Sequence, residues 1–461
     1  MSIVIKGGLL ALEEGPVRAD ILIEGEKIAG IGEGFAAEDC QVIDAGGLLV
    51  LPGGIDVHTH FNIDVGVRSV DDFTSGTVSA VFGGTTTIVD HMGFGPAGCD
   101  LHHQLEVYRG YTDGKCIADY GIHGVVQHVD DRILDEIPSM ISEGIPSMKI
   151  YLTYDYRLGD EDIIRFLDRM RREGGLTAVH CENHAVLTWL RQKYVREGKL
   201  QAKYHPLSRP AYCEAEAVDR MISLAQAAGN APLYIVHVST GQAAGLIRAA
   251  RQAGLPVYGE TCPQYLVLDD SSYEDPQEGL KYIMSPPLRA KEQQDFLWKG
   301  LREGYLQTVA TDHCSFDMHG DKQLGKDDFT KCPNGAPGVE LRLPILFSEG
   351  VKKKRIDLNT FVRVVSTNPA KLFGLYPRKG TIKVGSDADL VLLDPDMEVK
   401  IRKNILHDNA DYTPYEGMKA AGWPVMTLIR GHKVVENERL CVKEGFGQFL
   451  ARKPFTVDLF D

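Results

Sequence analysis

Two histidines separated by one residue, His58 and His60, stand where an apolar run gives way to polar residues. The apolar residues 48–51 and a Pro-Gly-Gly turn precede them, so we expect a short buried strand that ends at His60. Alternate side chains of a strand share a face, so both imidazoles point the same way and together can bind one metal ion. A lone His-x-His is more often a pair of hydrogen-bonded core residues, so the rest of the chain decides between the two interpretations.

Candidate strands elsewhere in the chain end in residues that can join such a site. Four of them carry a polar side chain near the carboxyl end: Lys149 in residues 147–152, His180 in 176–180, His237 in 233–238 and Asp312 in 308–312. Nitrogen and carboxylate donors of this kind suit zinc, which manganese or cobalt can replace. The combined set of four imidazoles, one carboxylate and one amine favours a metal centre over isolated structural histidines.

Lys149 needs a separate explanation, because an ammonium group has no lone pair and would repel metal ions. Its neutral amine can add carbon dioxide to form a carbamate, whose two oxygens can bridge two cations. Burial beside cations disfavours the ammonium form and so assists the deprotonation that this step requires. The alternative is an ordinary lysine that extends its charged end into solvent. With the histidines present, we favour N6-carboxylysine at Lys149.

A pair of cations in such a site would supply a specific chemistry. Two divalent ions about 3.5–4 Å apart would share a hydroxide, formed near neutral pH, and would polarise a carbonyl group. Asp312 would orient the hydroxide, accept its proton and deliver that proton to the leaving nitrogen. The reaction expected of this chain is therefore metal-dependent hydrolysis of an unactivated amide.

The central part of the chain has a pattern that brings these strand ends to one place. Helix-like stretches, for example 161–172 and 214–228, alternate with β-like runs. Eight candidate strands result: 51–58, 85–90, 121–127, 147–152, 176–180, 233–238, 257–260 and 308–312. Eight βα repeats predict an α/β fold with a TIM-type (β/α)8 barrel, whose active site lies at the carboxyl ends of the strands. A doubly wound open sheet is the alternative, but no Gly-x-Gly-x-x-Gly motif at a strand–helix turn supports it.

Both ends of the chain have short alternating apolar runs separated by glycine-rich turns, which is typical of antiparallel strands. We therefore expect residues 1–50 and 378–440 to form one small β-sandwich domain, with residues 51–377 inserted between them as the barrel. Residues 441–461 remain as a C-terminal extension.

Composition narrows the class of partner. The chain of 461 residues has 50 Lys and Arg against 64 Asp and Glu, a formal net charge of −14. A nucleic-acid partner is not expected, because phosphate binding needs a basic surface. We expect no membrane span, since no apolar run is long enough, and no signal peptide. Nine cysteines without a Cys-x-x-Cys pair indicate reduced thiols, and we expect a cytoplasmic protein.

Seven short motifs carry a resemblance to a known family. They are Asp56-x-His58-x-His60, Lys149-Ile-Tyr-Leu-Thr-Tyr154, Val179-His180-Cys-Glu-Asn183, Ile235-Val-His237-Val-Ser239, Glu260-Thr-Cys-Pro263, Ser285-Pro-Pro287 and Ala310-Thr-Asp312-His313. Over essentially the whole chain, the sequence resembles the hydantoinase/dihydropyrimidinase family of cyclic amidohydrolases. The segments 60–66 and 90–96 make it most similar to the phenylhydantoinase branch of that family.

The resemblance implies a role for each candidate ligand. One ion would be held by His58, His60 and Asp312, the other by His180 and His237, with carboxylated Lys149 as the bridge. Zinc is the metal that we expect, two ions per chain.

The resemblance also implies how a small cyclic imide or ureide is bound. Tyr154 would donate its hydroxyl to the developing oxyanion, and backbone groups of Ser285 and Asn334 would hold the planar imide of the ring. Four loop residues would line the pocket for the exocyclic substituent: Ile63, Val65, Tyr151 and Leu158. The family further implies a homotetramer, in which the tail from about Lys443 to Asp461 would reach a neighbouring subunit.

Several activities occur within this family. Residues 61–63 offer no cation for a substrate carboxylate, which argues against a dihydroorotase-like substrate. We expect hydrolysis of 5-substituted hydantoins to N-carbamoyl amino acids. The alternatives are a dihydropyrimidinase that acts on dihydrouracil or dihydrothymine, an allantoinase, which wants a more polar pocket, and a metal-free structural relative, which would lack the ligands that this chain retains.

Overall fold

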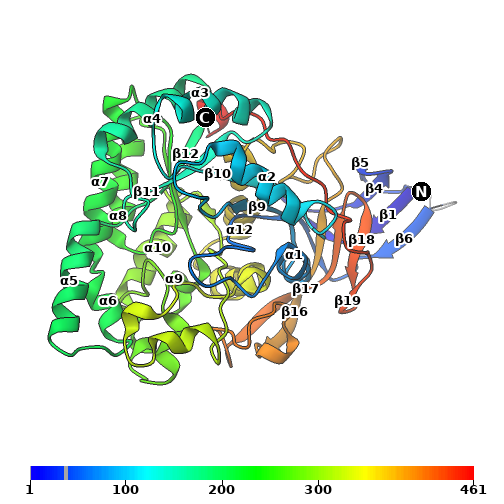
Figure 1. Ribbon diagram of the computed structural model, residues 1–461. Coiled ribbons are helices and arrows are strands. Elements are labelled where there is room, and N and C mark those ends of the chain that lie inside the picture. Colours follow the sequence, from blue (N-terminus) through cyan, green and yellow to red (C-terminus); the bar gives the residue numbers. More distant parts are fainter. Residues whose placement is uncertain (1, 36–39, 461) are drawn as a thin grey trace.

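The computed structural model describes residues 2–35 and 40–460. Among these residues, eight parallel strands form a barrel in which each strand pairs with the next along the chain (Figure 1). The strands are β8 (Gly54–Thr59), β9 (Thr85–His91), β10 (Asp119–Val125), β11 (Ser147–Tyr151), β12 (Leu176–His180), β13 (Leu233–Ile235), β14 (Val257–Thr261) and β15 (Thr308–Val309). A parallel bridge between Thr59 and His313 joins the end of this series to its beginning. The predicted TIM-type barrel is confirmed, and the sequential order excludes a doubly wound sheet.

Helices cover the outside of the barrel (Figure 1). They are α1 (Phe73–Phe82), α2 (Leu101–Thr112), α3 (Asp131–Ser142), α4 (Asp160–Arg172), α5 (His184–Arg196), α6 (Tyr204–Ser208), α7 (Ala211–Ala227), α8 (Gly241–Gln252), α9 (Pro263–Val267), α10 (Glu292–Glu303), α11 (Arg342–Leu346), α12 (Leu358–Val362) and α13 (Asn368–Leu372). Helix α4 illustrates the cause: its buried residues Ile163, Phe166, Leu167 and Met170 recur every three or four positions. Within the described ranges, no helix combines the length and apolar character that crossing a membrane requires.

Strands from both ends of the chain form two further sheets beside the barrel. One has the order β5-β4-β1-β6 and the other β19-β18-β17-β16-β7-β2-β3. The strands are β1 (Ser2–Lys6), β2 (Leu9–Leu12), β3 (Gly15–Arg18), β4 (Asp20–Glu24), β5 (Lys27–Gly32), β6 (Cys40–Asp44), β7 (Leu49–Pro52), β16 (Leu390–Lys400), β17 (Lys419–Ile429), β18 (His432–Glu436) and β19 (Arg439–Leu440). Ile21, Val50, Leu390 and Leu428 belong to one buried cluster, so the two chain ends share a core.

The passage from these sheets into the barrel corrects one predicted strand. Residues Leu49–Pro52 form β7, which pairs with β2 and β16, so the first barrel strand begins at Gly54 and not at Leu51. The crossing point is Gly53, where an added Cβ would lie only 2.1 Å from Thr86 Oγ1. Only glycine leaves room for the Thr86 side chain at this position.

The C-terminal extension packs back on the barrel of its own chain. Backbone N–H groups of Leu450 and Phe455 donate to the carbonyl oxygens of Tyr120 and Gly174, at 2.7 and 2.8 Å. Both side chains are buried in the cluster that contains Val57. Because these carbonyl groups lie near the amino ends of β10 and β12, the extension covers the end of the barrel opposite to the predicted site.

A buried lysine connects the barrel to the sheets beside it. Lys379 Nζ lies 2.6 Å from Asp119 Oδ2 of β10, 2.6 Å from Asp389 Oδ2 and 3.1 Å from Asp387 Oδ2. Burial disfavours the ammonium, but the three carboxylates outweigh it and raise the pKa of Lys379. The cation therefore holds together three acidic groups that would otherwise repel one another.

Candidate active site

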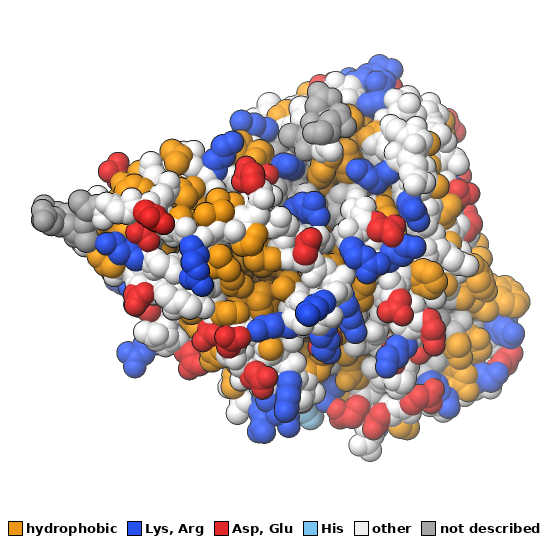
Figure 2. Space-filling view, turned by 180° about the vertical axis from the view of Figure 1, so that it is seen from behind, with side chains coloured by type: hydrophobic (Ala, Val, Ile, Leu, Met, Phe, Trp, Pro, Cys, Tyr) orange, Lys and Arg blue, Asp and Glu red, His pale blue; other side chains and the backbone are white. Residues whose placement is uncertain are grey.

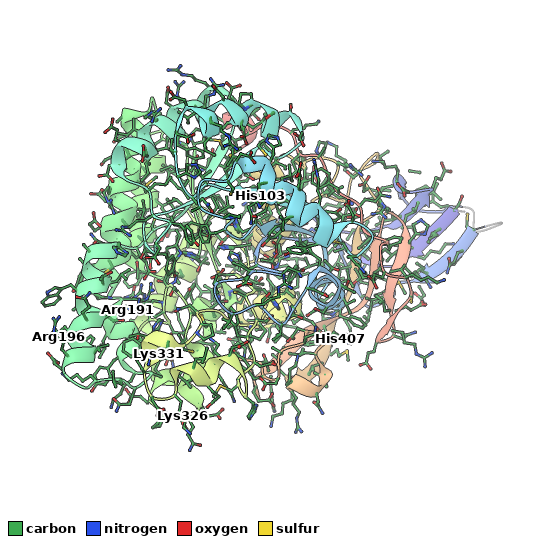
Figure 3. All side chains as sticks on the ribbon, in the orientation of Figure 1. His103, Arg191, Arg196, Lys326, Lys331 and His407 are labelled. Carbon is green, nitrogen blue, oxygen red and sulfur yellow. The ribbon has the colours of Figure 1, made fainter. Side chains whose placement is uncertain are left out.

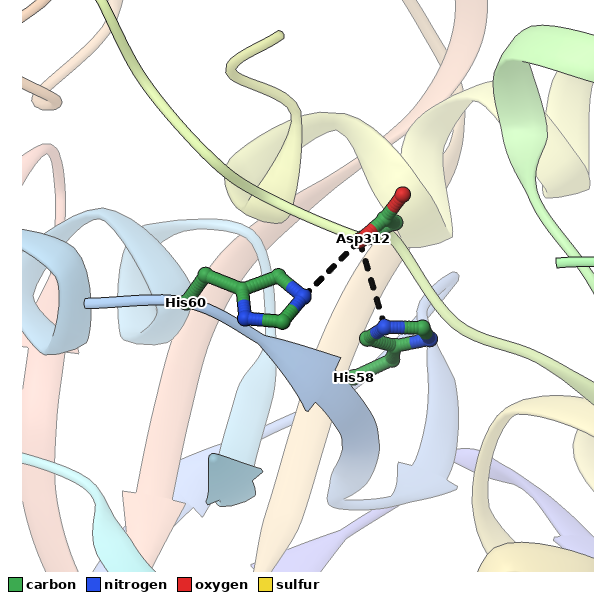
Figure 4. Close-up of side chains that lie close together, drawn as sticks. All are labelled: His58, His60 and Asp312. Carbon is green, nitrogen blue, oxygen red and sulfur yellow. Dashed lines mark ion pairs between the residues drawn. The ribbon is translucent and has the colours of Figure 1, made fainter. Parts of the chain in front are cut away.

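Three predicted ligands lie close together, two at the end of β8 and one in the segment that follows β15 (Figure 4). His58 Nε2 and His60 Nε2 each lie 3.2 Å from Asp312 Oδ1. One donor atom from each of the three residues lies within 4.8 Å of the others. The backbone N–H of Asp312 donates to His58 O at 2.9 Å and keeps the two ends in register. This spacing allows one cation to contact all three side chains.

A second group of predicted ligands lies beside the first. His180 Nδ1 and His237 Nε2 are 2.9 Å apart, and the His237 ring lies 5.4 Å from the His58 ring. Lys149 of β11 is buried and places its Nζ 3.4 Å from His58 Nε2. The structure thus brings together all the residues predicted to bind metal.

Two carboxylates that the motifs contain, but for which no role was predicted, fix the orientation of these rings. His58 Nδ1 donates to Glu260 Oε1 at 2.6 Å, and His180 Nε2 donates to Glu182 Oε2 at 2.8 Å. Each ring then keeps its other nitrogen as a lone-pair donor that faces the site. The signal was present in the sequence, since Glu260 ends a predicted strand and Glu182 follows His180 on the same side of the chain.

Burial sets the protonation of the site. Desolvation lowers the pKa of His58 and His237 well below the usual value, and the Lys149 charge adds to this effect. Burial likewise lowers the pKa of Lys149 to about 8, although Asp312 and Glu260 oppose it. Neutral imidazoles, a carboxylate and an amine that loses its proton near physiological pH are a donor set that fits divalent cations.

Burial raises the pKa of Glu260 to about 8, but the Lys149 cation and hydrogen bonds from Tyr234 and His237 oppose this change. Tyr234 Oη donates to Glu260 Oε2 at 2.8 Å, and the His237 backbone N–H donates to Oε1 at 3.0 Å. The carboxylate form is the one that these donors, and any cation in the site, favour.

A cavity of about 620 Å³ opens over the ligands. Twelve of the thirteen predicted site residues line it: His58, His60, Ile63, Val65, Lys149, Tyr151, Tyr154, His180, His237, Ser285, Asp312 and Asn334. Phe94 and Tyr156 line it as well, with rings stacked at 3.9 Å, and Phe94 lies 5.1 Å from the Tyr151 ring. One wall of the cavity is therefore aromatic, a surface on which a flat apolar substituent can pack.

The chain is similar to known proteins over nearly its whole length. The model of the amidohydrolase family matches residues 49–434. The chain belongs to the amidohydrolase family. A D-phenylhydantoinase of Escherichia coli O1:K1 / APEC is 51% identical over 457 residues, which cover 99% of each protein.

Solved structures support the same placement of this amidohydrolase. The dihydropyrimidinase from Brevibacillus agri NCHU1002 is 45% identical, with a TM-score of 0.97 over 99% of this chain and 100% of that one. The L-hydantoinase (dihydropyrimidinase) from Arthrobacter aurescens is 31% identical, with a TM-score of 0.90 over 97% and 99%. The resemblance to hydantoinases and dihydropyrimidinases predicted from the motifs is confirmed.

One predicted wall residue of this amidohydrolase lies elsewhere. Leu158 is buried, is not part of the cavity lining, and donates its backbone N–H to Tyr151 O at 3.1 Å. It anchors its loop instead of contacting a substituent. His91 is also buried behind the ligands, with its ring 4.4 Å from that of His58, and it does not line the cavity.

Three residues of the amidohydrolase site have left-handed backbone conformations. The φ angles of Tyr154, His237 and Asp312 are 68°, 41° and 54°. Each follows a strand that has already ended, so β13 and β15 are shorter than the predicted ranges 233–238 and 308–312. Residues other than glycine rarely adopt such angles, and those that do cluster at functional sites.

The predicted substrate-binding residues lie close to one another. Ser285 Oγ donates to Asn334 Oδ1 at 2.8 Å. Burial raises the pKa of Tyr154, although the Arg209 guanidinium, 5.7 Å from the centre of its ring, opposes this. Tyr154 therefore keeps its proton at neutral pH and is available as a hydrogen-bond donor.

Proposed function

We propose that this amidohydrolase hydrolyses the cyclic amide bond of 5-substituted hydantoins and yields N-carbamoyl amino acids. The observation that carries the proposal is the convergence of His58, His60 and Asp312 with His180 and His237 around Lys149, under a cavity with an aromatic wall. The identity to a D-phenylhydantoinase over the full length supports an aryl or alkyl substituent on that wall.

Each of these residues would have its own role in the hydrolysis. Two divalent ions held by these ligands, with zinc as the metal that their donor atoms suit best, would supply a hydroxide at neutral pH and polarise the carbonyl group. Asp312 would accept the proton of the attacking hydroxide and return it to the ring nitrogen as the C–N bond breaks. Tyr154 would donate its O–H to the carbonyl oxygen while that oxygen gains negative charge. Ser285 and Asn334 would hold the imide through backbone groups.

Lys149 would take part as N6-carboxylysine. Its neutral amine adds one carbon dioxide and releases one proton, so a neutral group becomes an anionic ligand with two oxygen atoms. A buried Lys149 with a pKa of about 8 supports this step, because the neutral amine is accessible near neutral pH. Lys149→Ala is expected to lose bound metal and activity, and a small added carboxylate is expected to restore part of both. The exposed Lys326→Ala serves as the control, and full metal content in Lys149→Ala would contradict the bridge.

The principal test compares kcat/KM for 5-phenylhydantoin, dihydrouracil and allantoin with metal analysis of the same preparation. We expect two ions per chain and a preference for the hydantoin. A preference for dihydrouracil would favour the dihydropyrimidinase alternative, which the similarity to the Brevibacillus agri dihydropyrimidinase supports. No bound metal after purification with zinc supplied would support a metal-free relative.

We also propose that the chain assembles as a homotetramer. Large apolar side chains are exposed on the neighbouring helices α5, α6 and α7: Trp189 is 57%, Leu207 52% and Tyr212 56% exposed. Figure 2, which views the molecule from behind, shows that apolar side chains also gather near the centre of that face, among charged ones. Surfaces of this kind often mark subunit contacts. Light scattering should give the mass of four chains, and Trp189→Glu should lower it if α5 lies in a contact.

A further inference from the structure

The cavity over the ligands has a second wall whose chemistry differs from that of the aromatic one. It is formed by Arg191 of α5 and by Thr330 and Lys331 of the short 3₁₀ segment Phe329–Lys331. Arg191 and Lys331 are both labelled in Figure 3, near the lower end of α5. Arg191 Nη2 donates to Thr330 O at 3.1 Å, which ties the helix to this segment. A cationic side chain thus faces the same cavity as the predicted metal ligands.

Arg191 differs from the other half-buried or buried arginines near this cavity. Arg209 pairs with Glu182, and Arg289 Nη2 lies 3.3 Å from Glu214 Oε2. Within the described residues, no carboxylate oxygen lies within 4.0 Å of the Arg191 guanidinium. A guanidinium has five N–H donors, so one hydrogen bond to Thr330 leaves most of them free for a ligand.

The acidic residues around Arg191 either have other partners or are exposed. Asp328 Oδ1 accepts from the Thr330 N–H and hydroxyl, and its Oδ2 lies 3.8 Å from Lys331 Nζ. Asp64 and Asp155 also line the cavity, but both are exposed at its mouth. Burial, and next the charge of Arg209, lower the pKa of Arg191, and the charges of Tyr154 and Asp328 oppose this change without cancelling it.

We propose that Arg191 forms a subsite for a carboxylate at the end of the substrate's exocyclic chain. The inference rests on the proposed function and extends its substrate class from aryl and alkyl hydantoins to 5-carboxyalkyl hydantoins. A planar guanidinium can hold a carboxylate through two parallel hydrogen bonds, an arrangement that a lysine cannot reproduce. Lys331, whose side chain is 70% exposed, adds positive potential at the solvent side. Substituents would thus sort by charge, with flat apolar groups on the Phe94 wall and acidic chains on the Arg191 wall.

A matched pair of substrates isolates the charge. 5-(2-Carboxyethyl)hydantoin and 5-propylhydantoin have chains of similar reach and differ in the terminal carboxylate. We expect Arg191→Met to lower the ratio of their kcat/KM values, acid over propyl, by about 10- to 100-fold, the range of one charge-assisted hydrogen bond. Arg191→Lys should recover part of the ratio. Arg196→Met removes an exposed arginine of the same helix, also labelled in Figure 3, and should keep the wild-type ratio.

Binding of the products separates this inference from the proposed function. Calorimetry would compare N-carbamoylglutamate with N-carbamoylnorvaline on the zinc-loaded protein and on both Arg191 variants. If the wild type opens no hydantoin, the proposed function fails, yet a preference for N-carbamoylglutamate that Arg191→Met abolishes would still establish the carboxylate subsite. An unchanged substrate ratio in Arg191→Met, or equal binding of the two products by the wild type, would overturn the subsite.

Discussion

Arg452 donates a hydrogen bond from Nη1 to the hydroxyl of Ser147, 2.8 Å away, across 305 positions of the sequence. Its Nη2 donates to Ile122 O at 2.6 Å, and the Ser147 hydroxyl also lies 2.6 Å from His123 Nδ1. Ser147 stands two residues before Lys149 on β11, so both side chains point into the barrel. The C-terminal extension therefore places a buried cation directly beneath the layer that carries Lys149.

We predict that Arg452→Met lowers the free energy of unfolding by about 2–3 kcal/mol, because the Ser147 hydroxyl and the Ile122 carbonyl lose a charged donor inside the barrel. Urea unfolding followed by circular dichroism measures the change. Lys453→Met is the control, since Lys453 is the exposed neighbour in the same extension and should shift stability by less than about 0.5 kcal/mol. Equal stability of the Arg452 variant and the wild type would make the contact incidental.

We predict that Lys379→Met lowers the free energy of unfolding by more than Arg452→Met does. Among the described residues, removal of this ammonium leaves the buried Asp389 without an ion-pair partner, while Asp119 keeps Arg430, and Asp387 keeps Lys27 and Arg378. Breaking a buried ion pair from one side typically destabilises a protein by about 3–5 kcal/mol. Thermal unfolding of Lys379→Met and of the exposed Lys383→Met, compared side by side, tests this. If the two variants have the same Tm, the contacts of Lys379 with the three carboxylates contribute no net stability.

Features carried by local pattern were predictable, and features set by long-range pairing were not. The alternation of strands and helices was sufficient for the barrel, and the polar residues at strand ends were sufficient to find the side chains that converge there. Residues 48–52 have the composition of a barrel strand, however, and only the pairing of β7 with β16 assigns them to another sheet. The chain turns at His237 and Asp312 because both have left-handed φ angles, which cannot be predicted from the types of these residues.

The walls of the cavity show the same division. Leu158 is apolar and lies near the site in sequence, which made it a natural candidate for the lining, yet it packs inward. Phe94 and Arg191 come from segments after other strands, and nothing in their local sequence distinguishes them from core or surface residues. Their role depends on which loops meet above the barrel, and that is a property of the whole fold.

Acid stability offers a third prediction, centred on Asp71. Burial alone would raise its pKa, but His313 Nε2, 3.0 Å from Asp71 Oδ2, and the Asn409 backbone N–H lower it to about 2. Since the folded pKa lies below the unfolded value of 3.8, this stabilisation is complete above about pH 4 and is lost as the pH falls toward 2. As the pH falls toward 2, the free energy of unfolding of the wild type should therefore decrease by about 2 kcal/mol more than that of Asp71→Asn. Unfolding midpoints between pH 2 and 5 measure it, and Asp295→Asn, at an exposed helix position, should follow the wild-type curve.

The last prediction concerns the hydroxyl of Tyr154. Tyr154→Phe keeps the ring that lines the cavity and removes only the donor, so an interaction formed as the carbonyl oxygen gains charge is lost. We expect kcat for a hydantoin to fall by about 10²–10³, the usual effect of deleting one oxyanion donor, while KM and metal content stay close to wild type. Tyr111→Phe, which removes a hydroxyl that accepts from Arg68 outside the cavity, is the control. Wild-type kcat in Tyr154→Phe would remove the hydroxyl from the mechanism, and a loss of metal would instead assign Tyr154 to the support of His180, whose ring lies 5.3 Å away.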